Sequence, residues 1–357
     1  MNVGDTLSNR YQIQEKIGQG GMQEVFRAID GVVEREVVVK TPLDGQTHRR
    51  FKQSAIIAAK VNNHGIAKTL DYFEEGERPF LVEEYVNGET LDVALLDFAS
   101  YIDPPFAAIL FGRLTKGIAA SHHAGVVHRD LKPSNIMISG GFSLDKVKIT
   151  DFGIATLAQE ILDEEIDNNP DITRSTSGTV KGAIPFMAPE MMFRRLGQPI
   201  GSPADVWSLG CMMFLALTGT YPFGVGMEAV LAIGNGERKG WPGFMTSDPQ
   251  FRPVAEELQR IVEMCLSQDP NARPTALELI DEISQLCVFS SPRIHGRIHH
   301  RHNAAVSFIW NDEGGETMLP TDSVYGPNRP QVGKRVAFSL SPGAPRSRAF
   351  PALVQSG

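Results

Sequence analysis

The chain has 357 residues, of which 42% are hydrophobic, so it can bury the core of one large two-lobed domain or of two ordinary domains. The net charge is −8, but residues 288–357 carry eight Lys/Arg against four Asp/Glu, a balance of +4 that leaves −12 for residues 1–287. An acidic body argues against a specific nucleic acid as the main partner, and the basic tail offers only a weak electrostatic contact.

The N-terminus shows no basic segment followed by an apolar run, and no stretch approaches the roughly 18 apolar residues of a membrane span. We therefore expect a cytoplasmic protein without a membrane span. The three cysteines, Cys211, Cys265 and Cys287, are odd in number and lie in apolar, helix-like segments. This favours buried free thiols over a disulfide framework or a metal site.

The first part of the chain has the pattern of a sheet. Its apolar runs are short and β-branched, and one helical stretch separates the third run from the fourth. The runs lie at residues 11–17, 24–29, 34–40, 66–73 and 79–86. They predict a five-stranded sheet with one inserted helix.

From about Leu91 the apolar period changes to that of a helix. The segment PFAAILFGRLTKGIAASHHAG gathers its large apolar residues on one face, among them Phe106, Leu110, Leu114 and Ile118. Further helices are predicted at residues 203–218, 226–236, 253–267 and 274–286. A small β-rich N-lobe of about residues 10–86 thus precedes a larger, mostly helical C-lobe of about residues 87–287, which is an α+β fold.

Beyond Val288 the periodic pattern ends. The tail, residues 288–357, contains SSPRIHGRIHHRH and seven prolines, and we predict a linker or a mostly disordered segment. The segments AAVSFIW and KRVAFSL offer at most a marginal strand pair. The four histidines at positions 295, 299, 300 and 302 have no cysteine or acid beside them, which favours a solvated basic segment over a metal site.

A series of motifs runs through the rest of the chain. IGQGGMQEV joins the first two strands, and fifteen residues past Val25 the third strand ends in Lys40. Then come VVHRDLKPSNIMI, KITDFGIA, FMAPE, SPADVWSLG and DPNARPT. A glycine-rich turn alone is weak evidence, because a tight hairpin also needs glycine. In this order the motifs strongly resemble the protein kinase family, specifically the eukaryotic-like Ser/Thr kinases of bacteria, over about residues 10–287.

The resemblance implies a two-lobed protein kinase fold that uses ATP and Mg²⁺. Asp130 would accept the proton of the substrate hydroxyl, and Lys132 would steady the γ-phosphate. Asn135 and Asp151 would hold Mg²⁺ through hard oxygen ligands, and Lys40 would hold the α- and β-phosphates. The other nucleotide-binding residues that the resemblance implies are Ile17, Gly18, Gly20, Gly21, Met22, Val25, Val38, Glu84, Val86 and Met137. In the same way Glu190 and Arg273 would pair as part of the scaffold, together with Asp205 and Trp207.

One position departs from the family pattern. Aligning RRFKQSAIIAAKVNNHGIA with the family's helix puts Ser54 where a glutamate normally pairs with the strand lysine. In FLVEEYV, Glu83 occupies the gatekeeper position, on a strand that the family's sheet places beside the one ending in Lys40. We hypothesise that Glu83 replaces the missing acid, because pairing with Lys40 would offset the cost of burying its charge. The alternative is a Glu83 that points to solvent or is protonated.

Two smaller departures concern Gln23 and Ala183. Gln23 replaces the third glycine of the phosphate loop, where the family needs a small or flexible residue rather than a ligand. Ala183 replaces a threonine whose hydroxyl, in the family, bonds the catalytic aspartate and lysine. The loss of this hydrogen bond would weaken the placement of the substrate by about 1 kcal/mol. The segment TRSTSGT offers hydroxyls for an activating phosphate near Arg129, with Thr176 or Thr179 favoured; the alternative is a flexible linker with ordinary polar residues.

The sequence therefore predicts a Ser/Thr protein kinase that acts on protein hydroxyls and on itself, with dimerisation as a route to autophosphorylation. The main alternative is a pseudokinase, a nucleotide-binding scaffold or switch, because Ser54 replaces the helix glutamate. Retention of Asp130, Lys132, Asn135 and Asp151 favours the enzyme. A small-molecule kinase of the same fold is less favoured, because DLKPSN, APE and the C-terminal helices are present.

Overall fold

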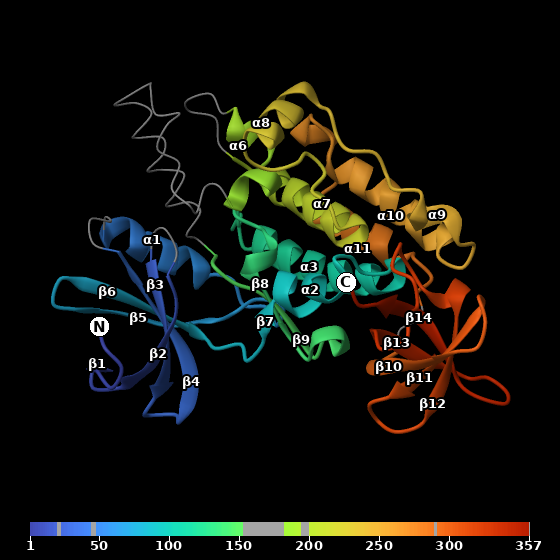
Figure 1. Cartoon of the computed structure of the whole chain (residues 1–357). Helices are drawn as coiled ribbons and strands as arrows, with labels where there is room; N and C mark the ends of the chain where they lie inside the picture. Colours follow the sequence, from blue (N-terminus) through green and yellow to red (C-terminus); the bar gives the residue numbers. More distant parts are fainter. Residues whose placement is uncertain (20–22, 44–47, 153–181, 194–199, 289–290, 357) are drawn as a thin grey trace.

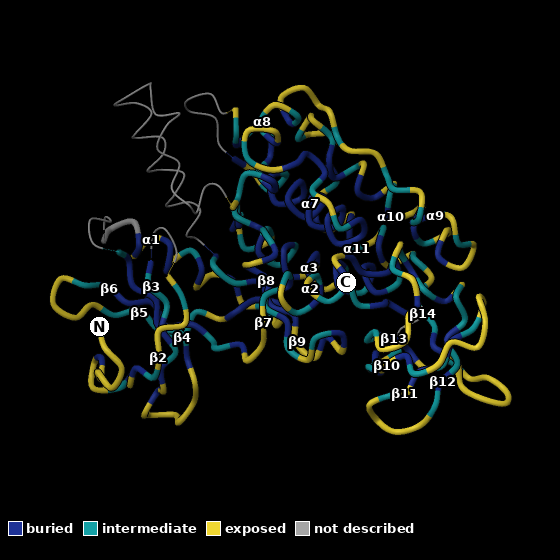
Figure 2. The backbone as a smooth tube through the Cα atoms, in the orientation of Figure 1, coloured by how far each residue is buried: buried dark blue, intermediate teal, exposed yellow. Residues whose placement is uncertain are grey.

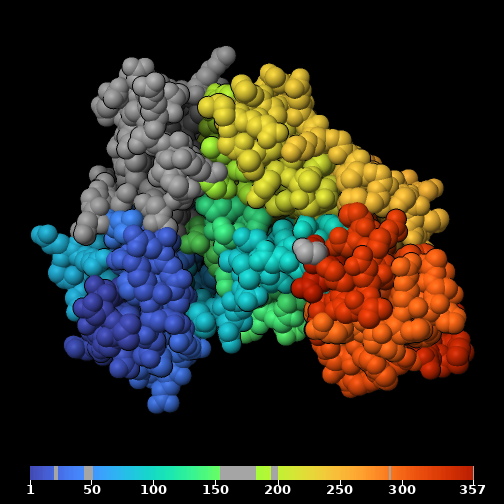
Figure 3. All heavy atoms as spheres, in the orientation of Figure 1, coloured from blue at the N-terminus to red at the C-terminus, as the bar shows by residue number. Residues whose placement is uncertain are grey.

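The structure is a computed structural model, and it describes residues 1–19, 23–43, 48–152, 182–193, 200–288 and 291–356. Figure 1 shows three parts in chain order: an N-terminal sheet, a helical part and a C-terminal barrel. The first two are the small β-rich lobe and the larger helical lobe that the sequence predicts. The helical lobe lies between the N-terminal sheet and the barrel (Figure 3).

The N-lobe is an antiparallel sheet in the order β1-β2-β3-β4-β6-β5. Its strands are β1 (Thr6–Leu7), β2 (Tyr11–Gln19), β3 (Gln23–Asp30), β4 (Arg35–Pro42), β5 (Thr69–Glu75) and β6 (Arg78–Glu84). The five predicted strands are confirmed, and β1 is a short addition that pairs with the start of β2. Helix α1 (His48–Ala58) follows β4 and packs Phe51 and Ala55 against Leu81 of β6.

The C-lobe is built around α7 (Pro203–Thr218), whose side chains are almost all buried (Figure 2). The preceding long helix, α3 (Pro104–His123), begins where the carboxylate of Asp103 accepts a hydrogen bond from Phe106 N at 3.2 Å, with Pro104 at the first helical position. Helix α7 ends at Gly219, whose φ of 75° is the left-handed conformation that glycine adopts most readily. The lobe therefore has the predicted long helices with their expected ends.

The remaining elements described in the C-lobe are η-helices, six further α-helices and a small sheet. The helices are η1 (Asp92–Leu96), α2 (Asp97–Ala99), η2 (Pro133–Asn135), η3 (Gly141–Ser143), η5 (Ile184–Phe186), α6 (Pro189–Met192), α8 (Gly226–Asn235), α9 (Phe244–Ser247), α10 (Arg252–Cys265), η6 (Pro270–Ala272) and α11 (Ala276–Ser284). The sheet has the order β7 (Glu89–Thr90), β8 (Ile136–Ser139) and β9 (Lys146–Ile149). No helix in the described ranges is both long and apolar enough to cross a membrane. Cys211 and Cys265 are buried free thiols as predicted, whereas Cys287 is exposed.

The prediction of a mostly disordered tail is wrong. Residues 293–354 form a closed barrel in the order β10-β11-β12-β14-β13, in which β12 and β14 run parallel and the other pairs are antiparallel. The elements are β10 (Arg293–Arg301), β11 (Val306–Asn311), β12 (Glu316–Pro320), η7 (Thr321–Ser323), β13 (Arg335–Ser341) and β14 (Arg348–Val354). The interior holds fully buried apolar side chains, among them Ile298, Ile309, Leu319, Val336 and Phe338. The basic residues that suggested disorder lie mainly on the outside, and closure leaves no unpaired sheet edge.

The barrel is docked on the C-lobe by buried contacts. Both carboxylate oxygens of Asp103 accept hydrogen bonds from Arg293 Nη2 at 2.7 Å, and both side chains are at most 4% exposed. The hydroxyl of Tyr325 donates to the backbone oxygen of Leu217 at 3.2 Å, and its ring packs against Phe251 of α10. The described residues of this segment, 291–356, are therefore part of the folded body rather than an independent tail.

Candidate active site between the lobes

A cleft of about 510 Å³ lies between the N-terminal sheet and the C-lobe. Its walls contain most of the nucleotide-binding residues that the sequence indicates. The predicted residues that line it are Ile17, Gly18, Val25, Val38, Lys40, Glu84, Val86, Met137 and Asp151. Gly20, Gly21 and Met22 lie outside the described residues. The structure thus brings together strand, hinge and C-lobe residues that are more than a hundred positions apart in the sequence.

Several lining residues were not predicted. They are Ala67, Gly88, Glu89, Thr90, Val93, Ser134 and Thr150. Ser134 and Thr150 lie inside KPSN and TDFG, so the motifs themselves held the signal. Ala67 and Val93 lie outside the motifs. They line the cleft because of the way the chain crosses between the lobes, which the sequence pattern does not show.

Lys40 is held by Glu83, as hypothesised. In the β4–β6 pair Glu83 lies opposite Val38, two residues from Lys40 on the same face of the sheet. Lys40 Nζ donates a hydrogen bond to Glu83 Oε2 and a second one, of 2.8 Å, to Asp151 Oδ1. The side chains of Lys40 and Glu83 are each only 5% exposed. The alternative in which Glu83 points to solvent is excluded, and Ser54 is buried on helix α1.

The three charged groups of this cluster affect each other's protonation. Burial is the largest influence on Lys40 and favours its neutral form, but the carboxylates of Asp151 and Glu83 outweigh it, so the pKa of Lys40 is raised. Burial would also raise the pKa of Asp151, yet the charge and hydrogen bond of Lys40 hold it below the usual value. Burial raises the pKa of Glu83, and the nearby negative charge of Asp151 adds to this while Lys40 opposes it. The protonated form of Lys40 and the carboxylate form of Asp151 are therefore favoured, and of the two carboxylates Glu83 is the easier to protonate.

Gln23 makes a contact in the site that the sequence did not predict. Its Nε2 donates to Asp151 Oδ1 at 3.1 Å, and the side chain is 9% exposed. The residue that replaces the third glycine of the phosphate loop therefore reaches the same carboxylate as Lys40. Gln23 and Lys40 together fix the orientation of Asp151 from the N-lobe side.

Asp130, Lys132 and Asn135 form a hydrogen-bonded group on the C-lobe side. Lys132 Nζ donates to Asp130 Oδ2 at 2.7 Å, and Asn135 Nδ2 donates to the same oxygen at 3.1 Å. Thr150 links this group to Asp151, because its backbone nitrogen donates to the backbone oxygen of Asn135 at 2.9 Å. The predicted base, lysine and two metal ligands thus come together in one connected arrangement.

Asp205 holds the loop that carries Asp130. Its buried carboxylate accepts hydrogen bonds from the backbone nitrogens of His128 at 2.8 Å and Arg129 at 2.7 Å, and lies 2.8 Å from His122 Nε2. Arg129 and Asp151 have φ values of 67° and 63°, a conformation that costs energy for residues other than glycine. The hydrogen bonds to Asp205 help to keep Arg129 in this conformation.

The predicted scaffold pair is also present. Arg273 donates from Nη1 to Glu190 Oε1 at 2.7 Å and from Nη2 to Glu190 Oε2 at 2.9 Å, a bidentate pair. The Arg273 guanidinium lies 4.9 Å from the ring centre of Trp207. Neither residue of this pair lines the cleft. The pair joins α6, which carries Glu190, to the end of η6 and to Trp207 of α7.

The acids and amides present fit a magnesium ion. Asp151 supplies carboxylate oxygens, and Asn135 turns its amide nitrogen toward Asp130, which leaves the amide oxygen as the free end. Small hard cations such as Mg²⁺ take oxygen ligands from one or two protein side chains plus phosphates. The described residues, the histidines of the barrel included, contain no group of three or more His, Cys, Asp or Glu that could hold a metal ion without such phosphate ligands.

The candidate phosphorylation sites between Thr173 and Thr179 lie outside the described residues. Ala183 is described and half-buried, and its methyl side chain offers no hydrogen bond to Asp130 or Lys132. Lys132 keeps its bond to Asp130 without that threonine.

Comparisons with known proteins agree with this geometry. A family model described as a protein kinase domain matches residues 11–283. The serine/threonine-protein kinase PknA of Mycobacterium tuberculosis is 36% identical over 281 residues, covering 76% of this chain and 59% of PknA. The serine/threonine-protein kinase PrkC of Bacillus subtilis is 30% identical over 276 residues, covering 76% of this chain and 39% of PrkC. The chain thus spans between about two fifths and three fifths of the length of these two relatives.

A solved structure has the same fold. The chain superposes on the crystal structure of Rad53 in complex with AMP-PNP with a TM-score of 0.59 and 24% sequence identity. The match covers 76% of this chain and 64% of that chain. At this level of identity the likeness concerns the fold alone.

Proposed function

Because the chain belongs to the protein kinase family, we propose that it transfers the γ-phosphoryl group of ATP to serine or threonine hydroxyls of proteins. The observation that carries this proposal is the connected group of Asp130, Lys132 and Asn135, which Thr150 joins to Asp151, the carboxylate that Lys40 contacts from the N-lobe. Phosphoryl transfer needs positioned cations, metal-binding acids and a base more than a covalent nucleophile. The residues of this group would supply these parts.

Each residue has a role in this proposal. The adenine ring would lie between Val25 and Val38 above and Met137 below, beside the hinge backbone of Glu84 and Val86, all of which line the cleft. The Lys40 ammonium would bind the α- and β-phosphates, and its raised pKa keeps it charged at neutral pH.

On the C-lobe side, Asp130 would orient the substrate hydroxyl and accept its proton. Lys132, which is bonded to Asp130, would neutralise charge on the transferred group. Asn135 and Asp151 would hold Mg²⁺. When bound, the metal neutralises phosphate charge during the transfer.

The pseudokinase alternative rested on the missing helix glutamate. The contact between Lys40 and Glu83 removes its main support, because the lysine has a buried acid partner. Autophosphorylation through transient association of two chains remains part of the proposal, as does a cytoplasmic location, which was expected from the sequence.

The test is phosphate incorporation by the purified chain with labelled ATP and Mg²⁺, compared with Asp130→Asn. We expect incorporation into a general protein substrate to fall by at least about a hundredfold in the variant, since it loses general-base catalysis. The matched control is Asp248→Asn, an acid on the far side of the C-lobe that does not line the cleft. Equal incorporation by wild type and Asp130→Asn, or none by either, would reject the enzyme in favour of a nucleotide-binding scaffold.

A further inference from the structure

The outer face of the barrel gathers aromatic and basic side chains. In β11 the buried Ser307 and Ile309 alternate with Phe308 and Trp310, which point outward, and Trp310 is 53% exposed. We call this surface the aromatic face and define it by six residues: His299, His300, Phe308, Trp310, Arg346 and Arg348. They come from β10, β11, β14 and the loop before β14.

The planar groups of the aromatic face are already arranged in stacks. The rings of His299 and Trp310 stack at 4.9 Å, with 29° between their planes. The rings of His300 and Phe308 stack at 6.2 Å, with 17° between their planes. The Arg346 guanidinium lies 5.3 Å from the centre of the Phe308 ring. The Trp310 ring is thus held in place and is largely exposed, so another ring can cover it, whereas the Phe308 ring is half-buried and already contacted by His300 and Arg346.

The aromatic face is also a positive surface on an acidic protein. Residues 288–357 carry +4, whereas residues 1–287 carry −12. Glu316, an acid that lies opposite Trp310, is paired with Arg346 and also lies 2.8 Å from His299 Nε2, so the charges of Glu316 and Arg346 offset each other. Arg348 makes no ion pair within the described part of the chain and is exposed. The sequence argued against nucleic acid as the main partner because the net charge of the whole chain combines this local surface with the acidic lobes.

We propose that the aromatic face binds single-stranded nucleic acid, with a base stacked on the exposed ring of Trp310 and with phosphates bound by Arg348. Every base has a flat face, so an exposed aromatic ring beside a basic group binds single strands with little regard to sequence. An acidic peptide would pair with Arg348 but would leave the Trp310 ring in water. In a duplex the base faces are already covered by their neighbours. The chemistry of this surface therefore favours an unpaired strand over both.

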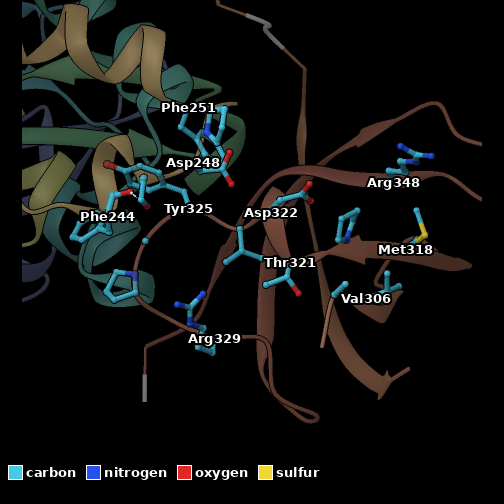
Figure 4. A pocket seen from close by; sticks show the side chains of 17 residues that line it. Phe244, Asp248, Phe251, Val306, Met318, Thr321, Asp322, Tyr325, Arg329 and Arg348 are labelled. Carbon is cyan, nitrogen blue, oxygen red and sulfur yellow. Dashed lines mark hydrogen bonds between the residues drawn. The ribbon is translucent and has the colours of Figure 1, made fainter. Parts of the chain in front are cut away.

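The aromatic face continues into a groove that the barrel shares with the C-lobe. Phe308 pairs with Met318 of β12, and Met318 pairs in turn with Arg348 of β14. Met318 and Arg348 form one wall of a pocket of about 860 Å³, and Phe244 and Asp248 of the C-lobe form the opposite wall. Figure 4 shows the two walls facing each other. A strand that crosses Phe308 toward Met318 therefore enters this groove.

The groove offers groups suited to base edges. Asp248 and Asp322 supply carboxylate oxygens that accept hydrogen bonds from the amino groups of bases, and Arg329 adds a further cation. Because Asp248 belongs to the C-lobe and Asp322 to the barrel, a bound strand would contact both parts. Nucleic acid binding would then be a property of the docked unit rather than of the barrel alone.

The test uses the full chain and fluorescence anisotropy with labelled dC and dT oligonucleotides of about 12 nucleotides, a length within the usual site sizes. Cytosine carries the amino group that Asp248 and Asp322 would accept a hydrogen bond from, and thymine lacks it. We expect binding that weakens as salt rises, and weaker binding of a duplex of the same length. Trp310→Ala should raise the Kd about tenfold, and Trp310→Phe, which keeps a flat ring, should restore most of the affinity. Arg348→Ala should raise the Kd and reduce its salt dependence.

The matched control is Phe193→Ala, which removes an aromatic ring of similar exposure, 50%, from the C-lobe. It should leave the Kd unchanged. A second measurement does not depend on whether Trp310→Ala folds stably. The oligonucleotide should quench tryptophan fluorescence in the wild type but not in Trp310→Phe, where Trp207 and Trp241 remain. The proposal is overturned if no oligonucleotide binds. It is also overturned if Trp310→Ala binds like the wild type while polyglutamate competes equally well, which would indicate an acidic protein partner.

Discussion

The ion pair between Lys40 and Glu83 gives the sharpest test of how this site works. Replacing Glu83 by methionine removes the carboxylate but keeps a long side chain of similar volume. Lys40 would keep its hydrogen bond to Asp151 but lose the partner that fixes it from the neighbouring strand. We expect ATP-dependent phosphorylation to fall while the fold survives.

The magnitude follows from the burial of the pair. Both side chains are 5% exposed, so solvent screens their interaction little. A hydrogen bond to a charged group contributes about 2 kcal/mol, and a loss of this size in the transition state lowers kcat/KM about thirtyfold. Removing one partner of a buried ion pair costs about 3–5 kcal/mol when the other charge is left unpaired. Lys40 keeps the carboxylate of Asp151 as a second partner, so the free energy of unfolding should fall by less than this amount. A large kinetic effect in a chain that still unfolds cooperatively is therefore the expected signature.

The assay is steady-state phosphorylation of a general protein substrate at varied ATP, with urea unfolding of each variant in parallel. Ser54→Ala is the matched control, because Ser54 is buried on α1 at the position where the family has its glutamate. It should leave kcat/KM within about twofold of the wild type, since a neutral hydroxyl contributes less than a charged partner of Lys40. Adding Ser54→Glu to Glu83→Met should restore part of the activity. Wild-type kcat/KM in Glu83→Met would refute the idea that Glu83 has taken over the role of the helix glutamate.

Three further predictions concern the barrel. Arg293→Met leaves the buried Asp103 without its cation, so the free energy of unfolding measured in urea should fall by about 3–5 kcal/mol. Arg297→Met on the surface is the control and should change it by less than about 0.5 kcal/mol. Equal effects of the two substitutions would contradict a stabilising role of the Arg293–Asp103 pair. A chain ending at residue 288 should lose solubility or melt at a lower temperature, because Tyr101 and Phe251 lose their contacts with Tyr325; an unchanged Tm would mean that the barrel adds nothing to the C-lobe. Burial beside Phe98 and Phe142 lowers the pKa of His295, and the charge of Arg335 lowers it further. The neutral imidazole of His295 therefore contributes fully to stability above the pKa of the unfolded chain, about 6.5, and this contribution is lost as the pH falls below that value. Tm measured between about pH 8 and pH 5 should therefore fall less in His295→Phe than in the wild type, and parallel profiles would exclude His295 as the cause.

The kinase lobes were predictable from the sequence because their chemistry fixes residue types at fixed spacings. Asp130, Lys132 and Asn135 lie within six positions, and the structure holds them in one hydrogen-bonded group. The partner of Lys40 was accessible for a different reason. Two adjacent antiparallel strands place residues two positions apart on the same face, so an acid on β6 near Lys40 was a reasonable candidate. The contact of Gln23 with Asp151 was not predictable, because it depends on where the hairpin folds over the cleft.

The barrel was missed because its signals are mixed. In β10 the buried residues include Gly296 and Arg293 as well as Ile298, so the apolar alternation is interrupted. Gly296 is required there, since a Cβ at this position would lie 2.4 Å from a side-chain carbon of Ile309. Arg293 is buried because Asp103, 190 positions earlier, neutralises it. Neither reason is visible in the tail itself, where basic residues and prolines indicate disorder when they are counted without their partners.

The place of the acid in the sheet also bears on control of the site. When the acid that holds the strand lysine comes from a helix, movement of that helix makes or breaks the pair, and kinases use this for regulation. Here Lys40 and Glu83 lie on β4 and β6, whose pairing is fixed by backbone hydrogen bonds of the same sheet. Displacement of α1 would leave that pairing in place. The remaining variable contact of Lys40 is the one with Asp151 in the C-lobe, so we infer that closure of the two lobes, rather than the position of α1, decides when the lysine is in place.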